Sequence, residues 1–597
     1  MTAIFFHPEA YTIQTDRLMG RHAAGHGFLR AWLRYCSQPR YEALVAERDQ
    51  VAAFKTAVKT YGRDQASDLF DWSASDALKH SGGLFFPGPG IATYAWYRRA
   101  MNTKEGLRDP DNRGDPSRAF SLIGITHTTA SAAAMDQICQ WLSAPVEPWD
   151  AVICTSEAVK QTLRLVLEKE SDYLRERLGA YRFSLPRLPV IPLGVHPEDF
   201  EFDAQERAVA RQQLLSRAGQ SADQRWTIVL YLGRLSFHAK AHPLAMYQAL
   251  QAALMQANRP SSKTTQRERI LLVECGWHAN EYIEKAFDEA AQWAMPEVSV
   301  LKMDGRDAMM RQTAWAGADV FCSLSDNIQE TFGITPIEAM ASSLPVVVSD
   351  WNGYKDTVRD GIDGFRVPSL MPSAGAGSDL ALRHAMDLDT YDMYCGFTSQ
   401  SIAIDVQAAA QALVKLVVDP ELRLRMGKAG QAHARSRFAW KGIIAQYETL
   451  FEDLRLERLH HPRLHPSVAS SGVSECSWPA RLDPFLSFGH YASVRLNETT
   501  TLKAVRPRVD LREALKQCQS LAMVNYAKAG LPPQTVLEAL LEGIASSVVG
   551  VSVRNLFEQV MQKTSKPMDD SWSRALVWLI KMDLVQFPVS DQSAQSE

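Results

Sequence analysis

The sequence predicts an α/β protein of two tandem doubly wound domains followed by a small, mainly α-helical domain. Short apolar runs rich in β-formers alternate with helical runs between about residues 226 and 368. Strands that are apolar throughout and alternate with helices are typical of parallel sheets covered on both faces. The first 200 residues alternate in the same way, less regularly, and helical spacing alone remains beyond residue 483.

The length and charge of the chain indicate how many domains it has and which partners it can bind. Its 597 residues exceed what one hydrophobic core usually supports, so several domains are expected. Lys and Arg together number 64 against 68 Asp and Glu, which gives a net charge of −4. This balance argues against nucleic acid as the partner.

Cysteine usage and the N-terminus indicate a reducing compartment. The eight cysteines are scattered without a C-x-x-C pair, so neither disulfides nor structural zinc is expected. The opening MTAIFFHPEA lacks the basic and long apolar segments of a signal peptide, and no apolar run reaches membrane-spanning length. We therefore expect a cytoplasmic protein with no transmembrane segment, while peripheral contact with a membrane surface stays open.

The first predicted domain covers residues 1–200. Its predicted strands are 3–7, 83–88, 121–127, 150–156 and 188–195, and its predicted helices include 25–36 and 91–101. The stretch GVHPEDFEF at 194–202 joins it to the second domain.

The second predicted domain covers residues 201–457. Its predicted strands are 226–233, 269–276, 298–305, 319–325, 345–350 and 363–368, each of the first four followed by a helix. The helical run 420–457 ends it. Residues 458–482, rich in His, Pro and Ser, are predicted to be a linker to the helical domain at 483–597, whose last residues form a polar tail.

The stretch SDNIQETFGITPIEAMASS, residues 325–343, holds Glu330 and Glu338 with seven residues between them. Pro336 favours a helix that starts here, because proline is tolerated at the first helical position. The pattern predicts a capping box with Thr335 as N-cap, Pro336 at N1 and Glu338 at N3. Glu330 then lies upstream, in a loop.

This stretch predicts a ligand site. Ligands of open α/β sheets bind beyond the carboxyl ends of the strands, and a helix N-terminus favours phosphate. Two carboxylates beside a phosphate site suit a ligand that also carries hydroxyls, such as a nucleoside diphosphate sugar. The alternative is that Glu338 only caps the helix and Glu330 is solvated.

A second pattern lies in YLGRLSFHAKAHP, residues 231–243. Arg234 and Lys240 follow a predicted strand and precede a helix that opens at Pro243. Two cations at a strand's carboxyl end can neutralise a leaving diphosphate without a metal. The alternative is a solvated basic loop.

These stretches together resemble glycosyltransferase family 4. The resemblance rests on GRL followed by a lysine, on GADVFCSLSDNIQETFGITPIEAMASSLPVVVSD with its paired glutamates, and on DGIDGFRVP. WDAVICTSEAVK and VIPLGVHPEDF of the first domain also agree. The resemblance covers roughly residues 1–457 and implies the GT-B fold, two Rossmann-like domains, and retention of anomeric configuration.

The resemblance also implies roles for the donor-site residues. Arg234 and Lys240 would contact the donor diphosphate, Glu338 the ribose and Glu330 the transferred sugar. Backbone amides would come from Phe332, Gly333 and Ile334.

Two departures from the family pattern are visible. The loop between Arg234 and Lys240 is one residue longer than the commonest form, and Ala241 stands where a glycine is usual. After RVPSL comes an insertion, residues 371–400.

In the first domain, His127 ends a predicted strand and is expected to face the interdomain cleft. A lone histidine there is equally well a satisfied structural partner, but the family has a cleft histidine near the transferred sugar. Gly25 and Gly27 follow the first strand; a plain turn explains them, whereas the family places a glycine-bearing loop on the phosphate and acceptor side.

No metal site is expected. The D-x-D pattern that would hold a divalent cation occurs at Asp387 and Asp389 and at Asp109 and Asp111, and neither copy follows a buried strand.

The sequence therefore predicts a retaining, metal-independent glycosyltransferase with His127 and Glu330 as catalytic residues. It would use no cofactor and would move a sugar from a UDP- or GDP-sugar to a glycan, lipid-linked or protein acceptor in bacterial-type glycan or glycoconjugate synthesis. Two alternatives stay open: another GT-B activity, such as a glycogen-, sucrose- or trehalose-type transferase or an epimerase, and a non-catalytic nucleotide-sugar-binding scaffold.

Overall fold

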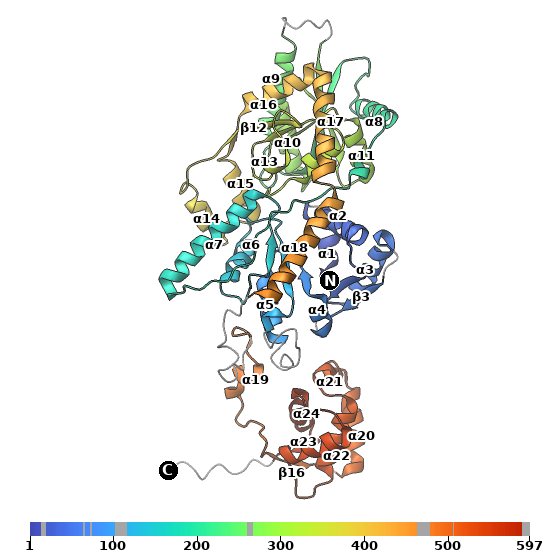
Figure 1. Ribbon diagram of the computed structural model, residues 1–597, viewed down its shortest axis with the longest axis vertical. Coiled ribbons are helices and arrows are strands. Elements are labelled where there is room, and N and C mark those ends of the chain that lie inside the picture. The colour runs from blue at the N-terminus through green and yellow to red at the C-terminus, as the bar shows by residue number, and fades with distance from the viewer. Residues whose placement is uncertain are drawn as a thin grey trace. The chain divides into compact units, whose positions relative to one another are not determined.

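The computed structural model of the chain describes residues 1–12, 20–63, 66–71, 75–101, 116–259, 267–461, 478–505 and 507–587. They form two compact units, Met1–Trp478 and Pro479–Glu597 (Figure 1). Most of the predicted linker, residues 462–477, and the polar tail from residue 588 lie outside the described residues, as does the D-x-D pattern at Asp109 and Asp111.

The first sheet of the larger unit has six parallel strands in the order β3-β2-β1-β4-β5-β6. Its strands are β1 (Ala3–Phe6), β2 (Tyr41–Val45), β3 (Ser67–Phe70), β4 (Gly83–Phe85), β5 (Ser121–Ile125) and β6 (Ala151–Ile153). The helices along this part of the chain are α1 (Pro8–Tyr11), α2 (Gly20–Tyr35), α3 (Arg48–Tyr61), α4 (Ser75–Ser81), α5 (Ile91–Met101), α6 (Ala132–Cys139) and α7 (Glu157–Leu178).

Both faces of this sheet are buried. Ile123 of β5 packs in a cluster with residues of α2, whereas its neighbour Leu122 packs with residues of α5 and α7. Successive side chains of a strand point to opposite faces, so a strand between two helical layers must be apolar throughout. This is why the predicted strands read as continuous apolar runs.

The second sheet also has six parallel strands, in the order β12-β11-β10-β7-β8-β9. Its strands are β7 (Trp226–Leu235), β8 (Arg269–His278), β9 (Ser299–Asp304), β10 (Val320–Ser323), β11 (Val346–Ser349) and β12 (Gly364–Val367). The helices are α8 (Ala204–Arg217), α9 (Leu244–Ala257), α10 (Glu281–Ala294), α11 (Ala308–Gly317), α12 (Ile334–Ala341), α13 (Tyr354–Thr357), α16 (Val406–Val418) and α17 (Pro420–Arg437). One face packs against α9, α10 and α16, and the other against α8, α11 and α12.

The two sheets share one topology. Numbered within each domain, both follow the order 3-2-1-4-5-6 of a Rossmann-like fold. The predicted fold class of two tandem doubly wound domains in the GT-B arrangement, with helices beyond them, is confirmed. In this topology the strand order reverses between the first and fourth strands, and ligands bind at that switch point. In the second sheet the switch point lies between β7 and β10.

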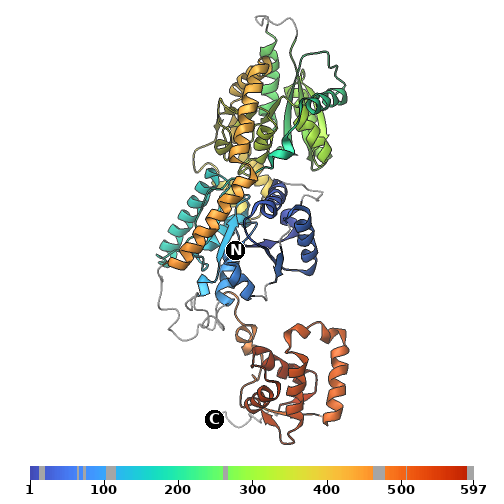
Figure 2. The same ribbon diagram turned by 45° about the vertical axis from the view of Figure 1, so that its right-hand side comes forward.

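The end of the predicted second domain belongs structurally to the first. The helical run 420–457 is two helices, α17 and α18 (Trp440–His460). Six buried residues of α18 lie in the first domain's core: Trp440, Ile443, Ile444, Tyr447, Leu450 and Leu454. Figure 2 shows α18 running along the first domain. The range 201–457 missed this because an amphipathic helix does not reveal which core receives its apolar face.

Gly25 and Gly27 lie inside α2, so the predicted glycine-bearing loop is wrong for these two residues. A Cβ on Gly25 would lie 1.9 Å from the backbone oxygen of Ala10, and one on Gly27 would lie 3.0 Å from the indole nitrogen of Trp440. Both glycines therefore allow close packing of α2, against α1 and α18. Their pattern resembled a loop because close approach and turns select the same residue.

The insertion after β12 folds as a small element of two strands and two helices. Strands β13 (Ser369–Leu370) and β14 (Ala403–Ile404) pair antiparallel at its base. Between them lie α14 (Ser378–Ala385) and α15 (Tyr391–Ser399).

The smaller unit has its own core, built around Leu502, Leu540, Leu556 and Leu576. Its helices are α19 (Pro484–Ser487), α20 (Arg508–Ser520), α21 (Ala522–Asn525), α22 (Gln534–Ala545), α23 (Val553–Thr564) and α24 (Asp570–Lys581). It also contains a three-stranded sheet in the order β16-β15-β17, which the sequence pattern did not predict. The strands, β15 (Thr501–Ala504), β16 (Val551–Ser552) and β17 (Val585–Gln586), are too short for a two-residue period to be recognised.

Among the described helices, none combines the length and the apolar character that crossing a membrane requires.

Candidate active site

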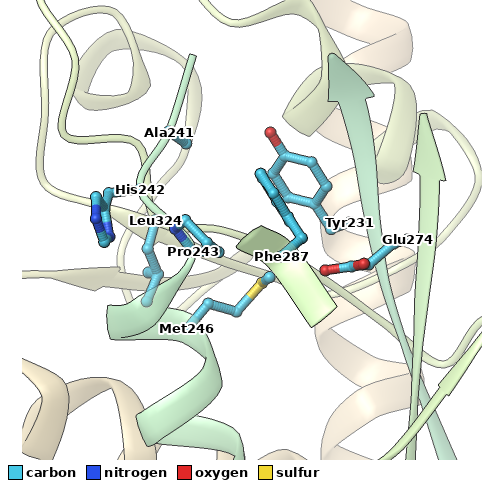
Figure 3. Close-up of a pocket in the computed structure, with 8 residues that line it drawn as sticks. All are labelled: Tyr231, Ala241, His242, Pro243, Met246, Glu274, Phe287 and Leu324. Atoms are coloured by element: carbon cyan, nitrogen blue, oxygen red, sulfur yellow. The ribbon is translucent and has the colours of Figure 1, made fainter. Parts of the chain in front are cut away.

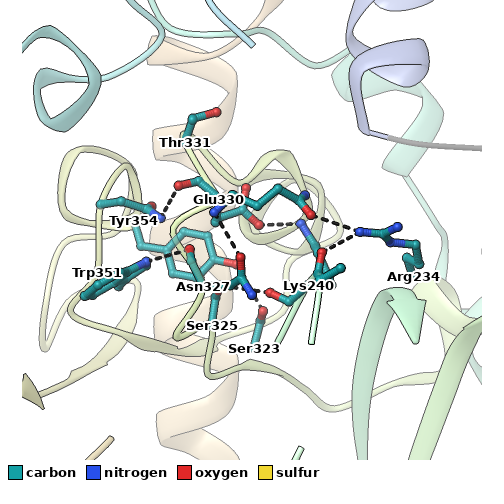
Figure 4. Close-up of polar contacts among 12 residues, drawn as sticks. Arg234, Lys240, Ser323, Ser325, Asn327, Glu330, Thr331, Trp351 and Tyr354 are labelled. Atoms are coloured by element: carbon teal, nitrogen blue, oxygen red, sulfur yellow. Dashed lines mark hydrogen bonds and ion pairs between the residues drawn. The ribbon is translucent and has the colours of Figure 1, made fainter. Parts of the chain in front are cut away.

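The loops after β7 and β10 meet at the switch point of the second sheet. Lys240, in the loop after β7, forms an ion pair with the carboxylate of Glu330, in the loop after β10 (Figure 4). The Glu330 side chain is only 9% exposed and that of Lys240 is 24% exposed. Two residues that lie 90 positions apart in sequence are thus brought together where this topology binds ligands.

Arg234 lies nearby but is still part of β7, which continues past the predicted end at Gly233 to Leu235. Its guanidinium donates to the backbone oxygen of Ala239 and, at 3.0 Å, to Oε1 of Gln329. Arg234 and Lys240 therefore both face the loop that carries Glu330, and they supply two positive charges to one place.

The loop that carries Glu330 is held by side-chain hydrogen bonds, which Figure 4 shows. The amide of Asn327 donates to the backbone oxygen of His238 at 3.1 Å and accepts from the backbone N–H of Gln329 at 3.0 Å. The Trp351 indole donates to the Asn327 backbone oxygen at 3.0 Å, and the Asn352 amide donates to that of Glu330. The backbone around Glu330 is therefore fixed by its neighbours before any ligand binds.

Helix α12 begins two residues earlier than the capping-box pattern predicts. Its N-cap is Gly333, with φ of 78° and no side-chain cap, so Thr335 is at N2, Pro336 at N3 and Glu338 at N5. The predicted capping box is wrong. Proline is equally compatible with N3, since the first N–H groups of a helix have no partner within it. Gly333 is required because a Cβ there would lie 1.9 Å from the buried ring of Tyr354, in a left-handed conformation.

Phe332 is buried in the core and anchors the turn before α12. Its N–H and those of Gly333 and Ile334 have no acceptor among the described residues. Three amides at a helix N-terminus make a place for negatively charged oxygens.

Glu338 does not cap α12 as predicted. Burial raises the pKa of its carboxyl to about 7, Arg311 lowers it and Asp199 raises it. No hydrogen bond joins this carboxyl to another described residue. A half-buried carboxyl without a protein partner can accept hydrogen bonds from a ligand's hydroxyls.

Buried polar side chains make hydrogen bonds beside the loops that carry Lys240 and Glu330. Figure 3 shows a small cavity lined by Tyr231, His242, Phe287 and Glu274 among others. Tyr247 donates a hydrogen bond to the Glu274 carboxyl, whose pKa burial raises to about 7. The backbone N–H of His242 donates to Asp326 at 3.1 Å, so Asp326 ties the loop that carries Lys240 to the one that carries Glu330.

A larger cavity opens at the carboxyl ends of the next two strands. It has a volume of about 420 Å³ and is lined by Gly276, Trp277, His278, Lys302, Asp304 and Arg306 among others. It adjoins the site of Arg234 and Lys240, because β8 and β9 are the next two strands after β7 in the sheet and Leu235 of β7 also lines the cavity.

β5 ends at Ile125, so His127 lies two residues beyond the strand that it was predicted to end. Its Nε2 lies 3.1 Å from the backbone oxygen of Pro87. A carbonyl only accepts, so Nε2 carries the hydrogen and Nδ1 keeps a lone pair. Burial lowers the pKa of the imidazole to about 4, with opposition from the hydrogen bond to Pro87. The ring is therefore neutral at pH 7.

The structure brings His127 to the second domain. The hydroxyl of Thr331, next to Glu330, donates to the backbone oxygen of His127. The hydroxyl of Ser156 donates to the backbone oxygen of Thr331 at 2.7 Å. The predicted catalytic pair, His127 and Glu330, thus lies at one junction of the two domains.

The other D-x-D pattern, Asp387 and Asp389, lies in the insertion, where Asp389 is paired with an arginine. Asp389 accepts two hydrogen bonds of 2.7 Å from the guanidinium of Arg383, and Asp387 has a left-handed backbone with φ of 53°. Within the described part of the chain, no three His, Cys, Asp or Glu side chains are grouped so that they could hold a metal.

Sequence reasoning missed the residues that support the site. Asn327, Trp351 and Asn352 act through the backbone of the Glu330 loop, and a sequence pattern does not show such contacts. Only Asn352 has a recognisable signal in the sequence, because the N-G pair in SDWNGY indicates a turn. The backbone of Asn352 has a φ of 36°, as such a turn requires.

Comparison with known proteins shows similarity to glycosyltransferases over part of the chain. Residues 215–376 match the family model described as Glycosyl transferases group 1. The D-inositol 3-phosphate glycosyltransferase of Thermobispora bispora is 25% identical over 342 residues, which cover 57% of this chain and 67% of that protein. The phosphatidyl-myo-inositol mannosyltransferase of Mycobacterium leprae is 33% identical over 149 residues, 25% of this chain but only 29% of that protein. The crystal structure of Anabaena Alr3699/HepE in complex with UDP and glucose is 14% identical, with a TM-score of 0.45 over 76% of this chain and 100% of that chain.

Proposed function

We propose, from the premise that this chain is a glycosyltransferase with a group 1 domain at residues 215–376, that it moves a sugar from a UDP- or GDP-sugar to a hydroxyl-bearing acceptor. The observation that carries the proposal is the meeting of Lys240, Arg234 and Glu330 at the switch point of the second sheet, beside the amides before α12.

The proposed donor pose assigns each group one part of the ligand. Arg234, Lys240 and the amides of Phe332, Gly333 and Ile334 neutralise the diphosphate. Glu338 accepts hydrogen bonds from the ribose, and the 420 Å³ cavity beyond takes the base. Glu330 leaves Lys240 when the donor binds and accepts from hydroxyls of the transferred sugar. This exchange keeps both charges paired, which limits the cost of burying them.

His127 is proposed to contact the transferred sugar from the first domain. Its neutral ring offers the Nδ1 lone pair to a sugar hydroxyl, and the lowered pKa of the buried imidazole keeps the ring neutral throughout the physiological range. A neutral acceptor positions the sugar without adding charge near the breaking bond.

The proposed reaction retains configuration and needs no metal. The bond between the anomeric carbon and the β-phosphate oxygen breaks, and the diphosphate leaves with the electron pair. The acceptor oxygen attacks from the same face, and its proton passes to the departing phosphate. Lys240, Arg234 and the amides stabilise the charge that develops on that phosphate.

The test is a panel of UDP- and GDP-sugars, scored by thermal shift and by released nucleoside diphosphate. A donor that raises the melting temperature and is slowly hydrolysed supports the proposal. Binding without turnover, under any acceptor tried, would favour a nucleotide-sugar-binding scaffold instead.

A further inference from the structure

The insertion between β12 and α16 reaches both domains of the larger unit. Its base is the antiparallel pair β13–β14, with Ser369 opposite Ile404 and Leu370 opposite Ala403. Arg383 and Asp389 pair within it, and the ring of His384 stacks on Tyr394 with 4.5 Å between centroids. The insertion is therefore a folded element, and its contacts with the loops around the site are well defined.

One end of α15 contacts the first domain. The hydroxyl of Tyr391 lies 3.1 Å from the hydroxyl of Thr128. Thr128 follows His127 directly, and its hydroxyl also accepts from the backbone N–H of Ala130 at 3.3 Å. Tyr391 thus holds the loop that carries His127.

The middle of α15 rests on the loop that carries Lys240. A Cβ on Gly396 would lie 2.9 Å from Cβ of His238, so the helix backbone touches this loop. The backbone oxygen of His238 accepts from Asn327, on the Glu330 loop. A glycine at 396 is what allows this approach.

Two elements of the second domain therefore hold adjacent residues of one first-domain loop. Thr331, beside Glu330, bonds the backbone of His127, and Tyr391 of the insertion bonds the side chain of Thr128. Both bonds lie next to the place where the proposed reaction breaks the donor bond. Together they hold the two domains closed beside His127.

We propose that Tyr391 is a specificity-determining residue that favours the acceptor hydroxyl over water. The inference rests on the proposed function. In both competing reactions the bond from the anomeric carbon to the phosphate oxygen breaks, and the new bond forms either to the acceptor oxygen or to water. The attacking oxygen gives its proton to the departing phosphate in each case. The Tyr391–Thr128 contact closes the junction on the insertion side, so that water enters less often while the donor waits for an acceptor.

The test compares Tyr391→Phe with Tyr394→Phe. Both variants remove one hydroxyl from α15, but the ring of Tyr394 stacks on His384 within the insertion. With the nucleotide sugar that the wild-type chain hydrolyses, and no acceptor present, Tyr391→Phe is expected to raise the hydrolysis rate about two- to tenfold at unchanged donor KM, the range for loss of one hydrogen bond. Tyr394→Phe is expected to match wild type.

The partner residue supplies a second comparison. Thr128→Val should raise hydrolysis at least as much as Tyr391→Phe, because it also removes the acceptor of the Ala130 N–H. Thr128→Ser, which keeps the hydroxyl, should leave the wild-type rate. The double variant T128V/Y391F should match Thr128→Val alone, because the bond to Tyr391 is already lost there. Additive effects, or hydrolysis unchanged in Tyr391→Phe, would overturn the inference.

A measurement without turnover separates this inference from the proposed function. Amide hydrogen exchange over residues 121–135 should be faster in Tyr391→Phe than in wild type, and unchanged in Tyr394→Phe. Faster exchange with no hydrolysis of any nucleotide sugar would keep the closure but refute the donor assignment. Hydrolysis that proceeds with exchange unchanged in Tyr391→Phe would refute the closure and keep the donor assignment.

Discussion

The ammonium of Lys240 and the carboxylate of Glu330 form an ion pair across the switch point of the second sheet. The pair joins the loop after β7 to the loop after β10, and each partner is mostly buried. A buried ion pair is weak evidence of stability by itself. The pair lies at the ligand end of the sheet, and in the proposed function a bound donor replaces each partner of the pair.

Lys240→Ala is expected to weaken binding of the nucleoside diphosphate about ten- to a hundredfold, because it removes a charged donor to the phosphates. Titration calorimetry with UDP and GDP measures this. Lys285→Ala is the control, since Lys285 lies on α10 with a side chain that is 78% exposed. Equal affinities for wild type and Lys240→Ala would remove Lys240 from the donor site.

Donor affinity is expected to rise with pH through the titration of Glu338. Burial raises the pKa of this carboxyl to about 7, while Arg311 lowers it and Asp199 raises it. Below that pH the carboxyl is protonated, and above it the ionised form accepts both ribose hydroxyls. Affinity for an intact nucleotide sugar should therefore increase about tenfold between about pH 6 and pH 8, as the ionised fraction does. The intact donor is used because its phosphates do not titrate in this range.

Glu338→Gln is the control for that pH series, since Glu274 and Asp326 also have a pKa raised to about 7 by burial. The variant should bind weakly and with little pH dependence. A pH dependence that survives in Glu338→Gln would assign the titration to another group.

Chelation is expected to leave turnover unchanged. Arg234 and Lys240 supply the positive charge that a divalent cation would otherwise bring to the diphosphate. Initial rates with and without EDTA, followed by added magnesium or manganese, measure this. Activity that is lost to EDTA and restored by either metal would contradict the assignment.

The chain cut after Trp478 is expected to stay folded and to hydrolyse donor. The larger unit ends there, and the smaller unit has a core of its own. We expect the smaller unit to recognise the acceptor or a protein partner, so transfer to an acceptor of the full chain should fall. A truncated chain that unfolds, or that no longer binds donor, would make the smaller unit part of the catalytic body.

The parts of this fold that the sequence predicted are those with a strong local pattern. Ile123 and Leu122 are buried on opposite faces, so both must be apolar, and this makes a buried strand easy to recognise. The paired glutamates were recognisable because they lie within one short stretch, although the exact start of α12 was not.

The parts that the sequence did not predict depend on contacts between distant segments. The sequence of α18 predicts an apolar face but does not show which of the two domain cores that face packs against. Gly27 matches a turn as well as it matches the close approach of Trp440. Tyr391 lies 263 positions from Thr128, and only the folded chain reveals that the insertion reaches the first domain.

The most direct test of the account measures Glu330→Gln in two ways on one preparation. Turnover of the donor is expected to fall about a hundredfold or more, because the carboxylate acts on the transferred sugar as charge develops. Affinity for the nucleoside diphosphate is expected to stay equal or to increase, since Lys240 is released from its partner. Glu289→Gln, on the exposed face of α10, controls for the loss of one charge. Near-normal turnover in Glu330→Gln would contradict the account.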